Sequence, residues 1–281
     1  MKRFIFLCLI CIFASYSSAY AWWGREHATV AQIAENHLTP KAKALMREYL
    51  GGRPMAYYAA HPDHFRHQMQ IPVGVEGEDI PDSASFSHAF YVDSEFKPLQ
   101  GPLNEHGKFT KNSIYDMERL ARGLKKDHRT MNDSVRLTHL YCIIHGMGDM
   151  HCPMHVEVDA NHPTPHGKYR LTFRDGDSKI NKSLHGLYEM RIISTHLPWG
   201  CGDLATMLDN LTSEQAEQVT QGDLRAWGEE SAREAALVYN EFKAGSTVDG
   251  KKLHEKCQKM AENSIVKAGY RLAKVLNDIL N

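Results

Sequence analysis

The sequence predicts a mainly α-helical fold in which residues 22–281 form a single helical domain. Three observations predict it. Apolar residues recur at spacings of three and four over most of the chain. Capping residues, glycines and prolines mark the ends of these segments, and one segment, at 168–177, alternates like a strand. We find no internal repeat, low-complexity tract or linker, so one core is the economical interpretation.

The first 21 residues are predicted to be a secretory signal peptide. Lys2 and Arg3 precede the apolar run "FIFLCLICIFA", which is too short to span a bilayer, and "SSAYA" ends in a small-residue cleavage pattern. Cleavage after Ala21 leaves Trp22 as the new N-terminus. We therefore expect a secreted or periplasmic protein without a transmembrane segment.

The first half of the remaining chain is predicted to contain three helices and a long loop. Helices are expected over 27–38, over 39–52 and over 111–126. The second begins with Pro40 in its first turn and ends at a pair of glycines, both of which are typical of those positions. Residues 71–111 are rich in proline and glycine and are expected to form a loop, with "HAFYVD" as a short extended piece.

The second half is predicted to be helical apart from one hairpin. We expect Asp133 to cap a long apolar helix over 134–150, which ends before Pro153. The alternating segment 168–177 turns at Asp175-Gly176 and is the one short β-hairpin-like piece. A helix over 183–197 is stopped by Pro198. Helices over 211–221, 223–242 and 252–280 complete the chain.

The composition excludes some classes of protein and singles out histidine. The formal net charge is −1, and removal of Lys2 and Arg3 takes it to −3. The chain therefore has no overall basic charge of the kind that would indicate tight nucleic-acid binding. A nucleic acid held by metals as a substrate is not excluded. The chain has 17 histidines, and eight of them lie between residues 139 and 196.

Four cysteines remain after removal of the signal: Cys142, Cys152, Cys201 and Cys257. In an exported protein they could form disulfides, but four cysteines allow three pairings and their spacing does not select one. Cys152 could instead be a metal ligand, because it lies within a dense group of histidines.

The segment "HGMGDMHCPMH" (145–155) is the strongest indication of a metal site. His145 and Asp149 are four residues apart on the predicted helix, so they share one face and could bind one ion. His155 follows Pro153 and could turn back toward the same cleft. An uncompensated imidazole and carboxylate next to the apolar "LYCIIHGM" would be costly to bury. A polar helix turn is the competing interpretation.

Two further parts of the chain could supply ligands. His185 and Glu189 repeat the four-residue spacing, although surface pairs of this kind are common. His27 lies five residues after Trp22, whose α-amine would titrate near neutral pH and could be deprotonated by a metal. His27 could also merely begin a helix.

"AAHPDHFRH" (59–67) places Asp63 three residues before Arg66. The carboxylate could bind a metal while the guanidinium, a planar and permanently charged donor, faces a phosphoryl group. A surface ion pair is the alternative for this pair alone.

Taken together, these motifs resemble the zinc-dependent single-strand nucleases of the mung bean nuclease and nuclease P-one type, a family grouped with the bacterial zinc phospholipases C. The family's N-terminal tryptophan with a histidine five residues later appears in "WWGREHATVA". Its D-x-x-R, its central H-x-x-G-D-x-x-x-P-x-H and its L-H-x-x-W-D correspond to "DHFR", "HGMGDMHCPMH" and "LHGLYE". The matches extend from residue 22 to residue 189.

The resemblance implies a cluster of three zinc ions in a cleft. The first ion would be bound by Trp22, His27 and Asp149. The second would be bound by Asp63, His145, a bridging Asp149 and one more histidine. The third would be bound by His155, His185 and Glu189, with the glutamate in place of the family's aspartate.

Some positions depart from the family pattern. Phe90 stands where the family has the remaining histidine of the second zinc, and we expect His88 to take its place. Tyr91 and Asp93 would then be the base-stacking aromatic and the base-binding carboxylate. The family's G-G-N is absent, and these changes lie around the expected substrate groove.

The resemblance implies a hydrolase acting on ester bonds: a zinc-dependent endonuclease and 3′-nucleotidase. Its substrates would be single-stranded DNA and RNA and 3′-nucleotides, and a metal-activated water would attack phosphorus with Asp63 and Arg66 as catalytic residues. No stable protein partner is implied. A zinc phospholipase C is the alternative enzyme, with "HLPWG" (196–200) as its best candidate membrane contact. A non-catalytic zinc-binding protein is the alternative of another class.

Overall fold

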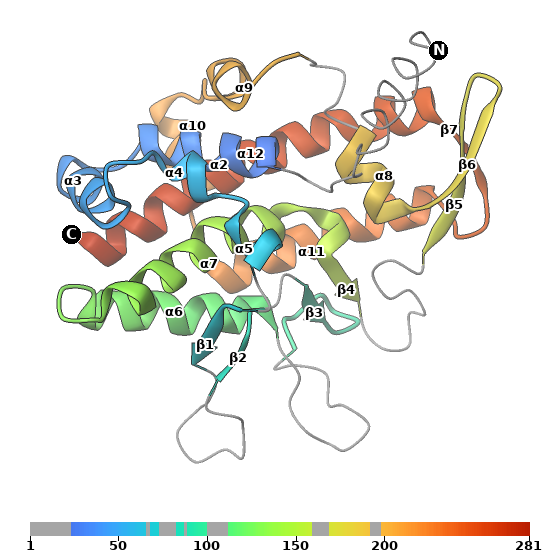
Figure 1. Ribbon diagram of the computed structural model, residues 1–281. Helices are drawn as coiled ribbons and strands as arrows, with labels where there is room; N and C mark the ends of the chain where they lie inside the picture. Colours follow the sequence, from blue (N-terminus) through green and yellow to red (C-terminus); the bar gives the residue numbers. More distant parts are fainter. Residues whose placement is uncertain are drawn as a thin grey trace, which may run out of the picture.

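The helix α7 (Asp133–His151) lies at the centre of the fold in the computed structural model, which describes residues 24–65, 68–72, 83–86, 89–99, 112–158, 169–191 and 198–281. Every residue of α7 from Cys142 to His151 is buried. A helix that is buried on all sides belongs in the interior of a protein. Around it pack α2 (Gly24–Asn36), α6 (Ser113–Asp127), α11 (Leu224–Glu241) and α12 (Gly250–Leu280) (Figure 1).

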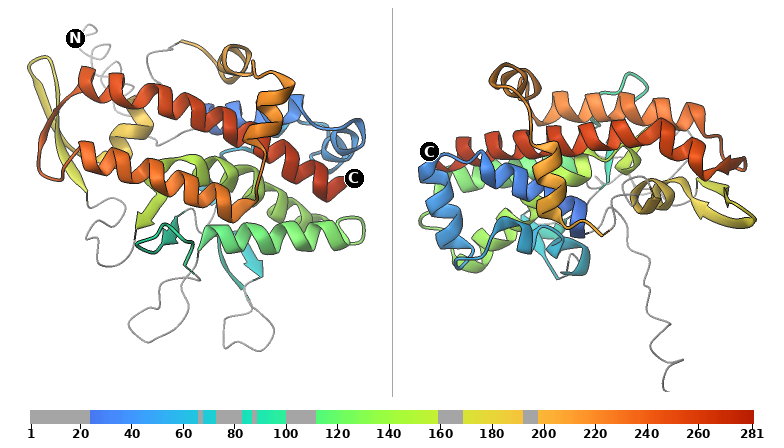
Figure 2. Two further views of the ribbon diagram at one scale, coloured as in Figure 1. Left: turned by 180° about the vertical axis from the view of Figure 1, so that it is seen from behind. Right: turned by 90° about the horizontal axis from the view of Figure 1, so that it is seen from above.

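The longest helix, α12, runs along the length of the molecule (Figure 2). It packs against α2 and α7 through small and branched apolar side chains. The sequence predicted that this helix begins at residue 252, whereas it begins two residues earlier, at Gly250. Asp249 caps it by accepting a hydrogen bond from the Lys251 amide. The fold class is therefore confirmed as mainly α-helical.

The caps explain where several predicted helices begin and end. Thr39 accepts a hydrogen bond from the Ala42 amide at the start of α3 (Pro40–Tyr49), which ends before Gly51, a residue with φ of 62°. Such a φ favours glycine. The predicted cap of α7 was wrong by one residue: Asn132 accepts from the Ser134 amide, while Asp133 lies in the first turn and pairs with Arg136.

Four short helical segments were not predicted. They are α4 (Met55–Tyr58), α5 (His61–Phe65), the 3₁₀ helix η1 (Pro153–His155) and α9 (Cys201–Leu208). Each is too short for apolar periodicity to identify it. Figure 1 shows α3, α4 and α5 following one another from the edge of the molecule to its centre, where α5 packs on α7.

The β-structure is also richer than a single hairpin. The predicted hairpin is present as β5 (Arg170–Asp175) and β6 (Ser178–Ser183), but β7 (Thr247–Asp249) adds a parallel strand to β5. β1 (Gln70–Pro72) pairs with β2 (Ser83–Ser85), and β3 (Phe90–Val92) pairs in parallel with β4 (Val156–Val158). These pairings join distant segments, so alternation within one segment does not predict them.

The remaining helices match their predictions closely. α8 (Leu184–Arg191) covers the first part of the segment expected to be helical to residue 197, and residues 192–197 lie outside the described part. α10 (Ser213–Val219) begins with a capping box between Thr212 and Gln215. The predicted signal peptide is not described either. No described helix is long and apolar enough to cross a membrane.

Candidate metal centre

His145 and Asp149 lie on one face of α7, one turn apart, as their spacing predicts. Both are 1% exposed, and the His145 Nε2 atom lies 3.0 Å from Asp149 Oδ2. The other ring nitrogen of His145 donates to the Ala59 carbonyl oxygen at 2.9 Å. This hydrogen bond fixes the ring with Nε2 toward the carboxylates, which is how proteins orient a metal-binding histidine.

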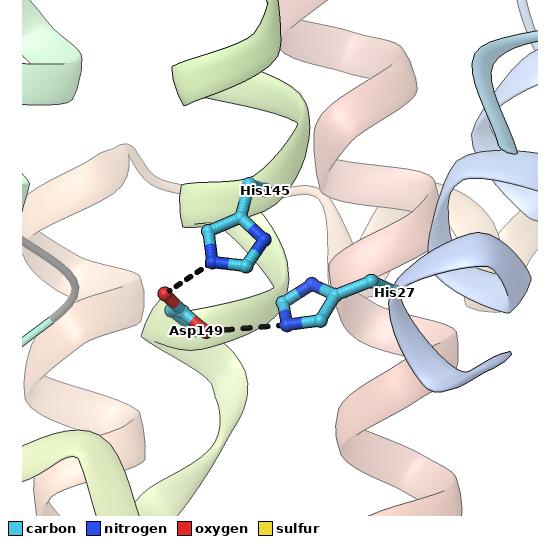
Figure 3. A group of neighbouring side chains, drawn as sticks. All are labelled: His27, His145 and Asp149. Atoms are coloured by element: carbon cyan, nitrogen blue, oxygen red, sulfur yellow. Dashed lines mark ion pairs between the residues drawn. The ribbon is translucent and has the colours of Figure 1, made fainter. Parts of the chain in front are cut away.

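Asp149 is shared between two histidines that come from different helices. Its Oδ1 atom lies 3.3 Å from Nε2 of His27, which is on α2, while Oδ2 faces His145 (Figure 3). The two imidazole rings stack with their centroids 4.1 Å apart. The ligand atoms of these three side chains all lie within 4.8 Å of one another. A carboxylate placed in this way has an oxygen available for each of two ions.

Gly148 allows α2 to bring His27 this close to α7. A Cβ atom at position 148 would lie 2.4 Å from His27 Nδ1 and 2.7 Å from Cε1. Real Cβ atoms do not come this close, so a side chain at 148 would displace the imidazole. The glycine next to Asp149 therefore has a packing role in the site.

Asp63 reaches the same cluster from α5. Its Oδ1 atom lies 3.3 Å from His145 Nε2, and its side chain is 26% exposed, unlike the buried Asp149. Burial alone would raise the pKa of Asp63, but the neighbouring His145 lowers it overall. Asp63 is thus an ionised carboxylate at the solvent-facing side of the cluster.

A second cluster forms where η1 meets α8. Nε2 of His155 lies 2.7 Å from Glu189 Oε1 and 3.2 Å from Nε2 of His185, and the His185–Glu189 distance is 2.9 Å. His185 and Glu189 share a face of α8 because they are four residues apart. Cys152 also presents its sulfur within 4.8 Å of the ligand atoms of His155 and Glu189.

The two clusters are adjacent. The His155 Nδ1 atom lies 3.7 Å from Asp149 Oδ1, while its Nε2 atom faces Glu189. Pro153 ends α7 and begins η1, so the chain turns and brings His155 back beside the helix that it has just left. His155 therefore lies between the two clusters.

The buried carboxylates of both clusters are ionised. Burial would raise the pKa of Asp149, but His145 and His155 hold it well below its usual range. Burial would lower the pKa of His145, but Asp149 and Asp63 raise it well above 6.5. Likewise, burial opposes ionisation of Glu189, yet His185 and His155 lower its pKa to about 2. These buried carboxylates stay ionised because cationic groups face them.

The donor set fits zinc. In a tetrahedral site with bonds of about 2.0 Å, ligand atoms lie about 3.3 Å apart, and both clusters show separations near that value. His145 Nε2 and Glu189 Oε2 are buried, and neither makes a hydrogen bond with a described residue. Buried imidazole and carboxylate atoms that are left without a hydrogen bond in this way are available as ligands of a cation. Burial raises the pKa of the Cys152 thiol, which disfavours the thiolate that a metal would bind.

Of the predicted substrate residues, Tyr91 lies on a strand that pairs with the chain leaving the second cluster. Tyr91 is a half-buried residue of β3 and pairs in register with Glu157 of β4, the strand that follows His155 directly. Phe90 is fully buried and packs toward Gly228 of α11, so it belongs to the core. The Oδ1 atom of Asp93 accepts hydrogen bonds from the Glu95 and Lys97 amides, which stabilises its own loop.

Three predicted site residues lie outside the described part of the chain: Trp22, Arg66 and His88. The structure brings together the other predicted ligands: His27, Asp63, His145, Asp149, His155, His185 and Glu189. The sequence interpretation missed the roles of Gly148 and of the Ala59 carbonyl. The glycine next to the acidic ligand was a usable signal for close helix approach. The cleft over the site stays a prediction.

The thiols of the described cysteines form no disulfide with one another. Cys142, Cys152 and Cys257 are buried, and Cys201 is partly exposed. The disulfides considered from the sequence are therefore absent among these four residues.

Comparisons with known proteins agree with the chemistry of the site. A family model described as S1/P1 Nuclease matches residues 22–281. The Arabidopsis thaliana protein "Endonuclease 1" is 24% identical over 315 aligned positions, which cover 99% of this chain and 93% of that protein.

Proposed function

The chain belongs to the S1/P1 nuclease family and is a hydrolase of phosphodiester bonds, and we propose that it cleaves single-stranded DNA and RNA and 3′-nucleotides with bound zinc. The arrangement around Asp149 is the observation that carries this proposal. One buried carboxylate faces His27 with one oxygen and His145 with the other, while Asp63 contacts His145 from the solvent side. This suits two neighbouring cations at the edge of a phosphodiester site.

We assign three zinc ions to the chain's own residues. His27, Asp149 and the N-terminal amine and carbonyl of Trp22 would hold the first. His145, Asp63, Asp149 and His88 would hold the second. His155, His185 and Glu189 would hold the third, and the 2.7–3.2 Å separations of these three side chains support that assignment.

Zinc at these positions would supply Lewis acidity toward the phosphoryl oxygens and would make water acidic enough to ionise near neutral pH. The protein's residues orient the reactants. Asp63, ionised and partly exposed, accepts a hydrogen bond from the attacking water. Arg66 donates its planar pair of hydrogen bonds to the phosphoryl group. Tyr91 stacks on a base and Asp93 accepts hydrogen bonds from it.

We also propose that the protein is exported and that its signal peptide is removed. A match to the family that begins at residue 22 supports this, because that residue is the expected new N-terminus. The free amine of Trp22 would then be available as a ligand. A chain carrying one additional residue before Trp22 should therefore bind less zinc than the chain that begins at Trp22.

Hydrolysis of single-stranded DNA and of phosphatidylcholine, with and without a zinc chelator, tests the proposal. We expect chelator-sensitive cleavage of DNA and none of the lipid. Lipid cleavage alone would assign the same zinc cluster to a phospholipase C.

Arg66→Ala separates catalysis from zinc storage. In an enzyme this variant should keep its zinc and lose most of its turnover, because the guanidinium stabilises charge on the phosphoryl group. Arg122→Ala is the matched control, since Arg122 is a 70% exposed arginine on α6. Zinc binding without hydrolysis of any phosphoester, in the parent protein, would support a non-catalytic role instead.

A further inference from the structure

A series of aromatic rings joins α4, α7 and α5. Its two ends are exposed to solvent, Tyr57 at 62% and Phe65 at 43%. Between these ends the ring centroids of successive neighbours are 4.5–4.8 Å apart. We call this series, in contact order Tyr57, Tyr58, Tyr141, His61 and Phe65, the aromatic track.

The aromatic track continues the line of metal ligands on α7. Tyr141, His145 and Asp149 are spaced by four residues, so they lie along one face of the helix. Tyr141 stacks on Tyr58 and contacts the His61 ring one turn before His145. The track therefore passes from the molecular surface to Tyr141, one helical turn from the metal ligand His145.

The outer end of the track is basic. The Arg53 guanidinium lies 4.4 Å above the Tyr57 ring. Lys43, Arg47 and Arg53 line a surface cavity of about 500 Å³, and none of them makes an ion pair with a described carboxylate. Glu35 also lines this cavity, but its carboxylate accepts the Met55 amide at the start of α4.

We propose that the aromatic track, with Lys43, Arg47 and Arg53, binds the single strand that enters the metal centre. This inference rests on the proposed nuclease function and extends it to a second set of binding residues. Exposed ring faces offer stacking to unpaired bases, and the cations offer contacts to the intervening phosphates. Bases in a duplex have their faces covered by neighbours, so the track selects single strands.

Packing alone does not account for the two exposed ends of the track. Tyr58 and Tyr141 pack partly against the core and could hold α4 on α7 without further rings. Tyr57 and Phe65 lie outward from that contact, where an apolar ring in water brings little stability. The exposure of both rings, with Arg53 against Tyr57 at one end, fits a ligand that carries both π faces and negative charge.

Binding of a labelled twelve-nucleotide thymidine strand, followed by fluorescence anisotropy in a chelator, tests the track without turnover. Tyr57→Leu and Phe65→Leu keep apolar bulk and remove the π face. Each should weaken binding by about 5- to 150-fold, since stacking contributes about 1–3 kcal/mol per base. Tyr57→Phe and Phe65→Tyr keep an aromatic ring and should bind the strand as the parent does. Leu237→Ala, at a 63% exposed site on α11, is the control.

The salt dependence of the same binding tests the cations. Arg47→Gln and Arg53→Gln should each reduce the slope of log K against log salt by about 0.7 for every phosphate contact removed. Arg122→Gln, on α6, should leave the slope as it is in the parent protein.

The test separates this inference from the proposed function. If the parent protein cleaves DNA in zinc while the leucine variants bind the strand as tightly as the parent, the track is overturned and the nuclease stands. If the parent binds the strand in a ring-dependent way but cleaves nothing in zinc, the track stands and the nuclease fails. If the parent enzyme is active, its kcat/KM should be higher for the twelve-nucleotide strand than for a dinucleotide. The leucine variants should lose this preference.

Discussion

At the scale of single residues, Asp149 lies at the junction of the two clusters of the candidate metal centre. It is 1% exposed, and its carboxylate lies within 3.0–3.7 Å of His27, His145 and His155. The neighbouring histidines keep it ionised despite its burial. A change at this position should therefore affect both clusters, whereas a change at Glu189 should affect the second cluster first.

Asp149→Asn tests this role. The amide is neutral and is a weak ligand, so we expect loss of bound zinc and a fall in DNA hydrolysis of more than about 100-fold. Removing a residue that only hydrogen bonds to a metal ligand typically costs about 10- to 100-fold, and removing a ligand itself should cost more. Zinc content by atomic emission and kcat/KM on single-stranded DNA are the two measurements. Asp133→Asn is the matched control on the same helix, because the Asp133 side chain is 85% exposed. Full zinc content in Asp149→Asn would contradict the assignment.

Gly148→Ala tests whether close approach of α2 positions His27. The added methyl group would lie 2.4 Å from the imidazole, so the ring must move away from Asp149. We expect a lower zinc content in a folded protein. Gly123→Ala is the control, because its Cβ would meet only ordinary contacts at 3.8 Å and helical alanine is favoured over glycine by about 1 kcal/mol. Equal zinc content in the two variants would show that His27 tolerates the displacement.

At the scale of elements, α7 combines the core of the fold with the candidate site. Its C-terminal part is fixed to α12 by a buried contact in which Arg271 donates to His151 Nε2, while His151 Nδ1 donates to the Met147 carbonyl oxygen. Arg271 also pairs with Glu230 of α11. These contacts join three helices at His151, two residues after Asp149. They limit movement of the turn that carries the ligands.

The contact between α6 and α7 should make stability depend on pH through His139. This residue is 4% exposed, and neither ring nitrogen has a hydrogen-bond partner among the described residues. Burial lowers its pKa below the ordinary value of 6.5. The unfolded chain then binds the proton more readily than the folded one, so stability is complete above pH 6.5 and falls as the pH decreases below it, by at most about 1.4 kcal/mol per unit.

His139→Leu should remove that part of the acid sensitivity. Urea denaturation midpoints of the parent and the variant, at pH 7.5 and pH 5.5, give the measurement. We expect the variant to gain stability relative to the parent at the lower pH, because leucine has no proton to bind. An identical difference between the two proteins at both pH values would contradict a buried neutral histidine.

At the scale of the whole molecule, the candidate centre joins segments far apart in the chain. Ligands come from α2, α5, α7, η1 and α8, so a bound ion would tie the N-terminal helices to the middle of the sequence. An ion that binds only the folded chain stabilises it by mass action. The protein's stability and its zinc content should therefore change together.

Zinc removal should lower the melting temperature of the entire chain. At a free zinc concentration 1,000 times Kd, linkage amounts to about 4 kcal/mol per site. We expect a lower Tm by calorimetry in chelator and its recovery when zinc is returned. Asp149→Asn should respond less to both additions. A Tm that is insensitive to chelator in the parent would contradict a metal that bridges these elements.

The sequence by itself determined the long helices, the mainly α-helical fold class and the local pairs of ligands. His145 with Asp149 and His185 with Glu189 follow from the helical repeat, because hydrogen bonds between residues four apart fix which side chains share a face. The family pattern added the more distant ligands, and the match to residues 22–281 agrees with that resemblance.

Only the tertiary structure decided how those local pairs come together. The approach of His27 to Asp149 depends on a glycine that lets α2 contact α7, and the parallel pairing of β3 with β4 puts Tyr91 beside the strand after His155. Two of the helices that carry the aromatic track, α4 and α5, are about one turn long and were not predicted. Periodicity reports local backbone geometry, whereas these contacts depend on packing between segments tens of residues apart, which no local pattern encodes.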